Sequence, residues 1–289
     1  MKTMQTKGLT LTVLFITLFS FACQKENSGH GTAGKSSVNI FLTDDPTLVF
    51  DKVLLDITKV EIKVEDDSDQ RHESEHQQGD DDSDHHGGTS GGWISVDIHP
   101  GIYDILRFRN GLDTLFGSVS FDATRALRKV RITLGNSNSV EINGASVPLT
   151  IHDNNNIVVL NIDESVVAIN SSGLTNFWID FDAGSSIRFH GNEFELKPRC
   201  KVFSKEKSGG IEGIVLPGNA GAVVMAINGT DTATAKPENS GEFKFIGLKP
   251  GNYTLVYHAT ANNYVDTTVS NVVISGKEDV HVAAVTLHQ

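Results

Sequence analysis

Alternation of apolar and polar side chains is the feature that most constrains this chain. Residues 60–64 read Val-Glu-Ile-Lys-Val, and residues 130–134 read Val-Arg-Ile-Thr-Leu. Successive side chains of a strand point to opposite faces of a sheet, so a period of two predicts half-buried antiparallel strands. The same kind of β-rich run recurs at residues 38–43, 53–64, 93–98, 129–134, 139–142, 157–162 and 177–181. The chain is therefore predicted to be all-β.

Turn signals separate these runs, and no stretch shows a sustained helical period. The clearest turns are Asp44-Asp45-Pro46, Gly135-Asn136, Asn143-Gly144 and Gly191-Asn192. Residues 103–116 are the best candidate for a short helix or an irregular crossover. We expect an N-terminal antiparallel β-sandwich or barrel-like domain over residues 38–203.

The composition changes after residues 204–210, a charged, glycine-bearing linker, and a smaller second domain is expected over residues 211–289. Within it, residues 243–248 alternate around Phe243 and Phe245, and Pro250-Gly251 follows. The chain then continues into Tyr253, Leu255 and Tyr257. This pattern predicts a hairpin in which the two tyrosines pack in the core.

The start of the chain indicates export. Lys2 and Lys7 precede an uncharged run at residues 9–22, which is too short to span a bilayer but has the length of a secretory h-region. With Ala22 directly before Cys23, the run resembles the lipobox of bacterial lipoproteins. The resemblance implies a signal peptide at residues 1–22, lipid on Cys23, and a flexible tether over residues 23–37.

Residues 24–26, Gln-Lys-Glu, resemble the tether of surface-exported bacterial lipoproteins. The resemblance implies an outer-membrane location, with the chain facing outward. Loss of the two signal-peptide lysines leaves 22 basic against 36 acidic residues, a balance of −14, which excludes nucleic acid as a partner. A lipidated Cys23 leaves Cys200 alone, so no intramolecular disulfide is expected.

Residues 65–88 interrupt the strands with ten acidic residues, one arginine and four histidines. This composition buries nothing, so we expect a disordered loop. Imidazoles with carboxylates suit transition metals, and carboxylates alone suit Ca²⁺. The candidate ligands are His72, His76, His85 and His86. The alternative is a solvated insertion that binds cations only loosely, and no cofactor is otherwise indicated.

Asp180 and Asp182 share one face of the run at residues 177–181, with Trp178 on the same side. Their spacing on a strand is roughly 7 Å. It suits an acid–base pair or part of a Ca²⁺ site, which Asp44 and Asp45 would join if their turn lies nearby. A solvated strand face is the alternative. No nucleophile, zinc or phosphate-loop motif accompanies the carboxylates, so no enzyme is predicted.

Sugar binding requires an exposed aromatic ring beside polar side chains. Trp178, on the Asp180 and Asp182 face, and Tyr264, in the sequence Asn262-Asn263-Tyr264, are the candidates. A neighbouring element that covers Trp178 would remove it from this role.

Several separated blocks together resemble the DUF4382 domain. They are Leu42-Thr43-Asp44-Asp45-Pro46, Ile57-Thr58-Lys59-Val60-Glu61, Trp93, Leu106-Arg107-Phe108-Arg109-Asn110-Gly111, Asp180-Phe181-Asp182-Ala183, Ser185-Ser186-Ile187 and Leu196-Lys197-Pro198. The resemblance spans about residues 36–203 and implies a β-rich lipoprotein domain of unestablished activity. The acidic loop resembles an enlarged variable region before the Trp.

Residues 211–288 resemble the carboxypeptidase-regulatory-like, or transthyretin-like, β-sandwich. The resemblance rests on the spacing of Gly241, Phe243, Phe245, Leu248, Pro250, Gly251, Tyr253 and Leu255. It implies a prealbumin-like spacer or partner-binding module, related in fold to starch-binding sandwiches.

The resulting hypothesis is a surface-anchored, non-catalytic binding or adhesion module, with carbohydrate as a candidate ligand. Two alternatives remain open: a structural subunit of a surface complex, with protein partners, and divalent-metal capture through the acidic loop.

Overall fold

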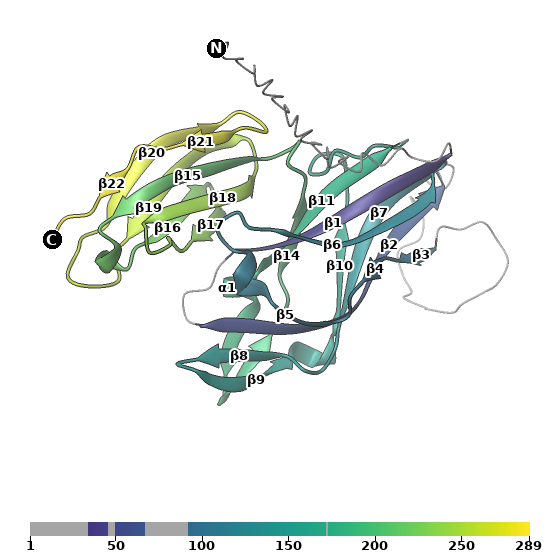
Figure 1. Cartoon of the computed structure of the whole chain (residues 1–289), viewed down its shortest axis with the longest axis horizontal. Coiled ribbons are helices and arrows are strands. Elements are labelled where there is room, and N and C mark those ends of the chain that lie inside the picture. The colour runs from purple at the N-terminus through teal and green to yellow at the C-terminus, as the bar shows by residue number, and fades with distance from the viewer. Residues whose placement is uncertain (1–33, 46–49, 67–91, 172) are drawn as a thin grey trace, which may run out of the picture. The chain divides into compact units, whose positions relative to one another are not determined.

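The computed structural model describes residues 34–45, 50–66, 92–171 and 173–289 (Figure 1). These residues belong to one compact unit, Gly31–Gln289. Nearly all of its regular structure is β, as the alternation predicts. Within the described ranges, no helix is long and apolar enough to cross a membrane.

The first sheet of the N-terminal sandwich has five strands and is centred on β1, the first strand within the described residues (Figure 1). Its order is β14 (Cys200–Phe203), β11 (Leu174–Asp182), β1 (Lys35–Asp45), β6 (Thr114–Asp122) and β4 (Asp97–Ile98).

The second sheet has nine strands and is centred on the long β2. Its path is β10 (Ile157–Asn161), β7 (Arg125–Leu134), β2 (Lys52–Asp66), β8 (Ser139–Ile142), β9 (Ala145–Ile151), β13 (Glu193–Leu196) and β12 (Ile187–His190). Two further strands, β3 (Trp93–Ser95) and β5 (Gly101–Asp104), pair with β2. Inward-facing residues of both sheets form one hydrophobic cluster, so the sheets share a core.

Two four-stranded sheets make the C-terminal sandwich, with a separate hydrophobic cluster. One contains β18 (Glu242–Leu248), β15 (Gly209–Leu216), β21 (Asp279–His281) and β22 (Val285–Thr286). The other has the order β17 (Asp231–Ala235), β16 (Val223–Asn228), β19 (Gly251–His258) and β20 (Thr267–Ile274). As predicted, Tyr253 and Tyr257 lie in this core, 3% and 0% exposed.

The helices within the described residues are short and connect strands. They are η2 (Ile105–Phe108), η3 (His152–Asn154), α1 (Ala183–Ser186) and η4 (Gly218–Ala220). The first lies inside residues 103–116, where a short helix or crossover was predicted. The Asn143-Gly144 turn also joins two paired strands, β8 and β9, as predicted. Both turn residues have positive φ, 50° and 76°, as this tight hairpin connection requires.

One strand pair departs from the antiparallel arrangement expected for the N-terminal domain, and one predicted hairpin is wrong. β1 and β11 pair in parallel, and the long chain between them provides the crossover that a parallel pair needs. β18 and β19 do not form a hairpin, because β18 pairs with β15 while β19 pairs with β16 and β20. The turn at Pro250 therefore carries the chain from one sheet to the other, and the aromatic residues of both strands enter the core between them.

Several predicted boundaries also move. β1 begins at Lys35, inside the predicted tether, and runs through Asp45, inside the predicted turn. β2 continues to Asp66, past the predicted start of the acidic loop, because Glu65 and Asp66 pair with Ala126 and Arg125 of β7. β15 begins at Gly209, within the predicted linker.

Candidate functional site

Asp180 and Asp182, which the sequence placed on one strand face, both make contacts within the fold. β11 lies between β1 and β14, and Asp180 faces Thr43 on one side and Lys201 on the other. The Asp180 carboxylate is 5% exposed, and its Oδ2 lies 2.9 Å from Lys201 Nζ. The charge of Asp180 is therefore used in a cross-strand ion pair, and the prediction of an open strand face is wrong for this residue.

Asp182 and Asp44 hold the turn that follows β11. Asp182 Oδ1 accepts a hydrogen bond from Ser185 N at 2.8 Å and caps the short α1. Asp44 is 6% exposed, and its Oδ1 accepts from Ala183 N at 3.4 Å. The two carboxylates thus approach the same turn, which meets the condition that the sequence analysis set for Asp44, but they satisfy backbone groups there. The side chain of Asp45 lies outside the described structure.

Cys200, the first residue of β14, pairs with Phe181 and packs against the core of the N-terminal sandwich. Burial, and then the charges of Asp180, Asp182 and Asp44, raise the pKa of its thiol far above the ordinary value. The thiol therefore stays protonated at neutral pH, so this cysteine is a poor nucleophile.

Trp178 is buried, so the exposed sugar-stacking platform predicted there is wrong. Its side chain is only 6% exposed. The ring stacks on Phe41 at 4.6 Å and on Phe203 at 5.9 Å between centroids, and Lys205 Nζ lies 4.5 Å above it. The indole Nε1 donates to Asp113 Oδ2 at 2.7 Å. Phe41 of β1, Phe203 of β14 and Lys205 therefore cover the ring. The sequence analysis had named such covering by a neighbouring element as the alternative to sugar binding.

Tyr264 is partly exposed and packs against the core of the C-terminal sandwich. Its remaining exposure leaves contact with a ligand a prediction. Cys23, His72, His76, His85 and His86 lie outside the described residues. Among the described side chains, no group of three or more His, Cys, Asp or Glu is arranged to hold a metal ion.

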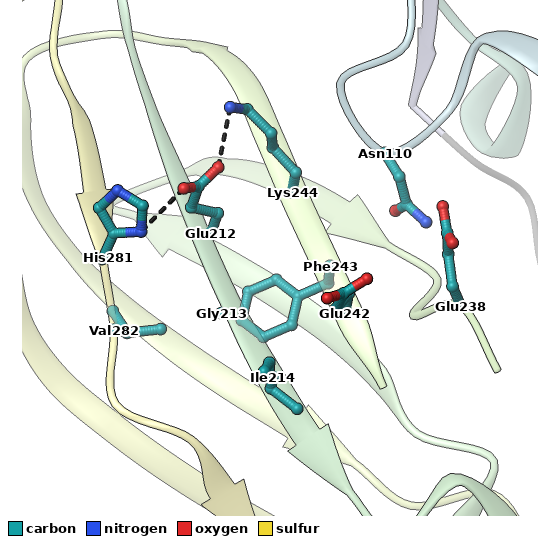
Figure 2. A pocket seen from close by; sticks show the side chains of 10 residues that line it. All are labelled: Asn110, Glu212, Gly213, Ile214, Glu238, Glu242, Phe243, Lys244, His281 and Val282. Atoms are coloured by element: carbon teal, nitrogen blue, oxygen red, sulfur yellow. Dashed lines mark hydrogen bonds and ion pairs between the residues drawn. The ribbon is translucent and has the colours of Figure 1, made fainter. Parts of the chain in front are cut away.

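A groove of about 440 Å³ lies over the outer side of β18 and β15, and Figure 2 shows its lining. Glu212 stands at one end, between His281 and Lys244. Glu212 Oε1 is 2.8 Å from His281 Nδ1, and its Oε2 is 2.8 Å from Lys244 Nζ. Lys244 also pairs with Asp279. Burial opposes the lysine charge, but the bonds to Asp279 and Glu212 outweigh it and raise the pKa of Lys244.

The other part of the groove combines carboxylates with aliphatic surface. Glu238 and Glu242 line it together with Ile214 and Val282. Among the described residues, neither carboxylate has an ion-pair partner, although Glu242 Oε2 lies 3.2 Å from the Ser240 hydroxyl. The exposed fraction of Ile214 is 36%. The groove thus places two uncompensated negative charges beside apolar side chains.

Sequence reasoning missed both this groove and a second exposed feature, the partly exposed Trp93 on β3. The sequence could not show that β18 and β15 place Glu242 and Ile214 side by side as a cross-strand pair. Trp93 began a predicted β-rich run and formed part of a family motif, but its single neighbouring strand was not visible from the sequence.

No curated protein matches the chain. Among solved structures, a mutant type II cohesin–X-dockerin complex from Acetivibrio cellulolyticus is 18% identical, covering 27% of this chain and 56% of that chain, with a TM-score of 0.23. The chain thus spans little more than half of that protein. The Bacillus anthracis TIE protein is 12% identical over 89% of this chain and 35% of its own, with a TM-score of 0.23.

GBS52, the minor pilin of Streptococcus agalactiae, is 10% identical over 89% of this chain and 97% of its own, with a TM-score of 0.20. At these scores the likeness extends no further than β-rich structure. The family comparison is firmer: the model described as Domain of unknown function (DUF4382) matches residues 35–198, more than half of the sequence. The chain belongs to the DUF4382 family.

Proposed function

We propose that this protein is a non-catalytic binding module, held at the outer surface of a bacterium by lipid on Cys23, and that it takes part in a surface complex. The lipobox-like sequence before Cys23 supports the anchor, and the Lys-Glu pair after it supports outward display. The transthyretin-like spacing of the C-terminal sequence supports a partner-binding role for that sandwich.

Asp180 and Asp182, which the sequence offered as an acid–base pair, and the Cys200 thiol support a non-catalytic role. Asp180 is paired with Lys201, Asp182 caps α1, and the Cys200 thiol is held protonated. Each of these groups has a structural role near the end of β11. Together they do not provide a free nucleophile beside a base. Recognition therefore accounts for the exposed chemistry better than a reaction does.

The observation that carries the proposal is the pair of uncompensated carboxylates, Glu238 and Glu242, beside Ile214 and Val282. A lysine or arginine side chain matches this surface, because its aliphatic stem packs on apolar groups while its charged end reaches carboxylates. Among the described residues, Phe243 is the one Phe, Tyr or Trp side chain that lines the groove, and because it is 3% exposed it offers no platform for a sugar. We therefore propose a basic segment of a protein partner as its ligand.

The test uses two blocked hexapeptides that differ only in a central lysine or norleucine. Isothermal titration of the purified protein should detect the lysine peptide and a loss of about tenfold in affinity for the norleucine peptide. The double substitution Glu238→Gln, Glu242→Gln should produce a similar loss. Glu164→Gln, at an exposed position of the N-terminal sandwich, is the matched control. Equal binding of both peptides, or no effect of the double substitution, would reject the groove as the site.

The anchor has its own test. Cys23→Ser removes the sulfur that would carry lipid, so the variant should leave the membrane fraction and appear in soluble extracts. Protease treatment of intact cells should digest the parent protein and so report outward display. A variant that stays in the membrane fraction would contradict the proposed anchor.

A further inference from the structure

The outer face of the nine-stranded sheet carries a second candidate surface, in the N-terminal sandwich. Val60, Ile62 and Val64 of β2 are 0% exposed in the core, so Glu61 and Lys63 point to the other face. In the register of the sheet, Lys63 lies opposite Trp93 of β3 on one side and Lys129 of β7 on the other. An aromatic ring and two ammonium groups therefore stand in one row across three strands.

The neighbouring row fixes the position of the ring. Glu61 faces Arg131 across the strands, and the Arg131 guanidinium carbon lies 4.2 Å from the Trp93 ring centroid. Arg131 Nη2 and Nε lie 2.7 Å and 2.8 Å from Glu61 Oε2, and Lys59 Nζ lies 2.7 Å from Oε1. This two-point contact holds the guanidinium against the indole, which remains partly exposed.

Glu61 stays charged although it is 5% exposed. Burial opposes ionisation, but the hydrogen bonds and charges of Lys59 and Arg131 outweigh it and lower the pKa of this carboxyl group. The ion pairs of Glu61 with Lys59 and Arg131 therefore persist at neutral pH. They hold Arg131 against the Trp93 ring before any ligand binds.

Among the described side chains of this face, cations outnumber anions, although the whole chain is acidic with a formal charge of −12. Glu61 is shared by Lys59 and Arg131, and Glu65 lies 2.8 Å from Lys63. Within the described part of the chain, no ion pair involves Lys129. We call this surface the Trp93 face; it consists of Trp93, Glu61, Lys63, Lys129 and Arg131. It offers a flat ring with surplus positive charge beside it.

We propose that the Trp93 face binds an acidic saccharide. An indole ring provides flat apolar surface for the C–H face of a pyranose, while lysine and arginine donate to carboxylate or sulfate groups. The surface goes beyond the proposed function, because it lies on different strands from the groove and takes a ligand of the opposite charge.

A polyanion such as single-stranded nucleic acid also uses rings and cations, but three features favour the saccharide. The face presents one ring, whereas nucleic-acid grooves stack successive bases on several rings. Its surplus charge is small, and the rest of the chain is acidic and would repel closely spaced phosphates. A saccharide with one acidic group per sugar or per few sugars matches a single ring flanked by few cations.

The test is isothermal titration of the purified protein with tetragalacturonate and with a sulfated galactose tetrasaccharide, against neutral galactotetraose. Binding of at least one acidic ligand is expected, with an affinity about tenfold or more above that for the neutral one. The affinity should fall as salt rises. Trp93→Ala and Lys129→Ala should each weaken binding about fivefold or more, and Trp93→Phe should retain part of it.

Lys277→Ala is the matched control, since Lys277 is an exposed lysine of the C-terminal sandwich. Circular dichroism establishes that each variant is folded. No binding of either acidic ligand by folded protein would overturn the proposal. So would equal binding of the neutral ligand, an effect of Lys277→Ala as large as that of Lys129→Ala, or tighter binding of a dT8 oligonucleotide.

Discussion

The two tryptophans of the N-terminal sandwich each contact a cation but differ in exposure, because Trp178 is buried and Trp93 is partly exposed. Each lies under a cation, Lys205 for Trp178 and Arg131 for Trp93. Trp178 sits on a strand with neighbours on both sides, and each neighbour places a phenylalanine against its ring. Trp93 sits on a three-residue strand that pairs with β2, and its cross-strand neighbour is a lysine. Exposure of a strand residue is therefore decided by the flanking strands as well as by alternation.

The largest effect on stability is expected for Trp178→Ala. The substitution removes a 6% exposed ring, its two stacking contacts and its bond to Asp113, so the free energy of unfolding should fall by about 3–5 kcal/mol. Urea unfolding at pH 7 measures it. Trp178→Phe keeps part of the stack and should lose roughly half as much. A loss below about 1 kcal/mol for Trp178→Ala would contradict the buried position.

Glu61→Gln tests the support under Trp93. It leaves Arg131 and Lys59 without their carboxylate, and because both are partly exposed we expect a loss of about 1–2 kcal/mol at pH 7. The pKa of Glu61 is lowered on folding, so its contribution is complete above the ordinary value of 4.5 and disappears as pH falls through the lowered value. Unfolding curves of parent and variant should therefore converge in acid, and a constant difference would disprove the assignment.

Trp93→Ala should cost less stability, about 1 kcal/mol or less, because its ring is partly exposed and belongs to a short strand. When Trp93→Ala and Trp178→Ala are measured in the same urea titration, the losses in free energy of unfolding at the two positions can be compared directly. Equal losses would mean that the two rings are buried alike, and the comparison would fail.

The smallest effect is expected for replacing residues 67–88 by a short Gly-Ser linker. The predicted metal ligands His72, His76, His85 and His86 would be lost, so binding of Zn²⁺ or Ca²⁺ should fall in an equilibrium dialysis experiment. The unfolding midpoint and the Trp fluorescence maximum should change little. Unchanged metal uptake would remove the metal-capture alternative.

Local pattern predicted much of the fold. Alternation located the β2 and β7 core positions, and the Asn143-Gly144 turn gave a correct hairpin, because both depend on neighbouring residues. The parallel pairing of β1 with β11 depends on residues far apart in sequence. The turn at Pro250 resembles a hairpin locally, and only the assembled sandwich shows that its two strands belong to different sheets.

The candidate sites were harder to predict for the same reason. The sequence offered Asp44 as a neighbour of Asp182 only on the condition that its turn lay nearby, and it could not show that Lys201 would neutralise Asp180. Nor could it show that Phe41 and Phe203, from two other strands, would cover Trp178. The groove and the Trp93 face likewise consist of residues that become neighbours only through strand register.

The parallel pairing of β1 with β11 also determines how late in translation β1 can complete its native pairing. β1 leaves the ribosome before both of its neighbours: β6 follows about midway through the N-terminal sandwich, and β11 follows only near its end. Until β11 has been made, one edge of an apolar strand, with Val38, Ile40 and Leu42 on its core side, has no native partner. Such distant pairing slows folding and lengthens exposure to aggregation. The nascent chain should therefore depend on a holding chaperone until β11 has emerged.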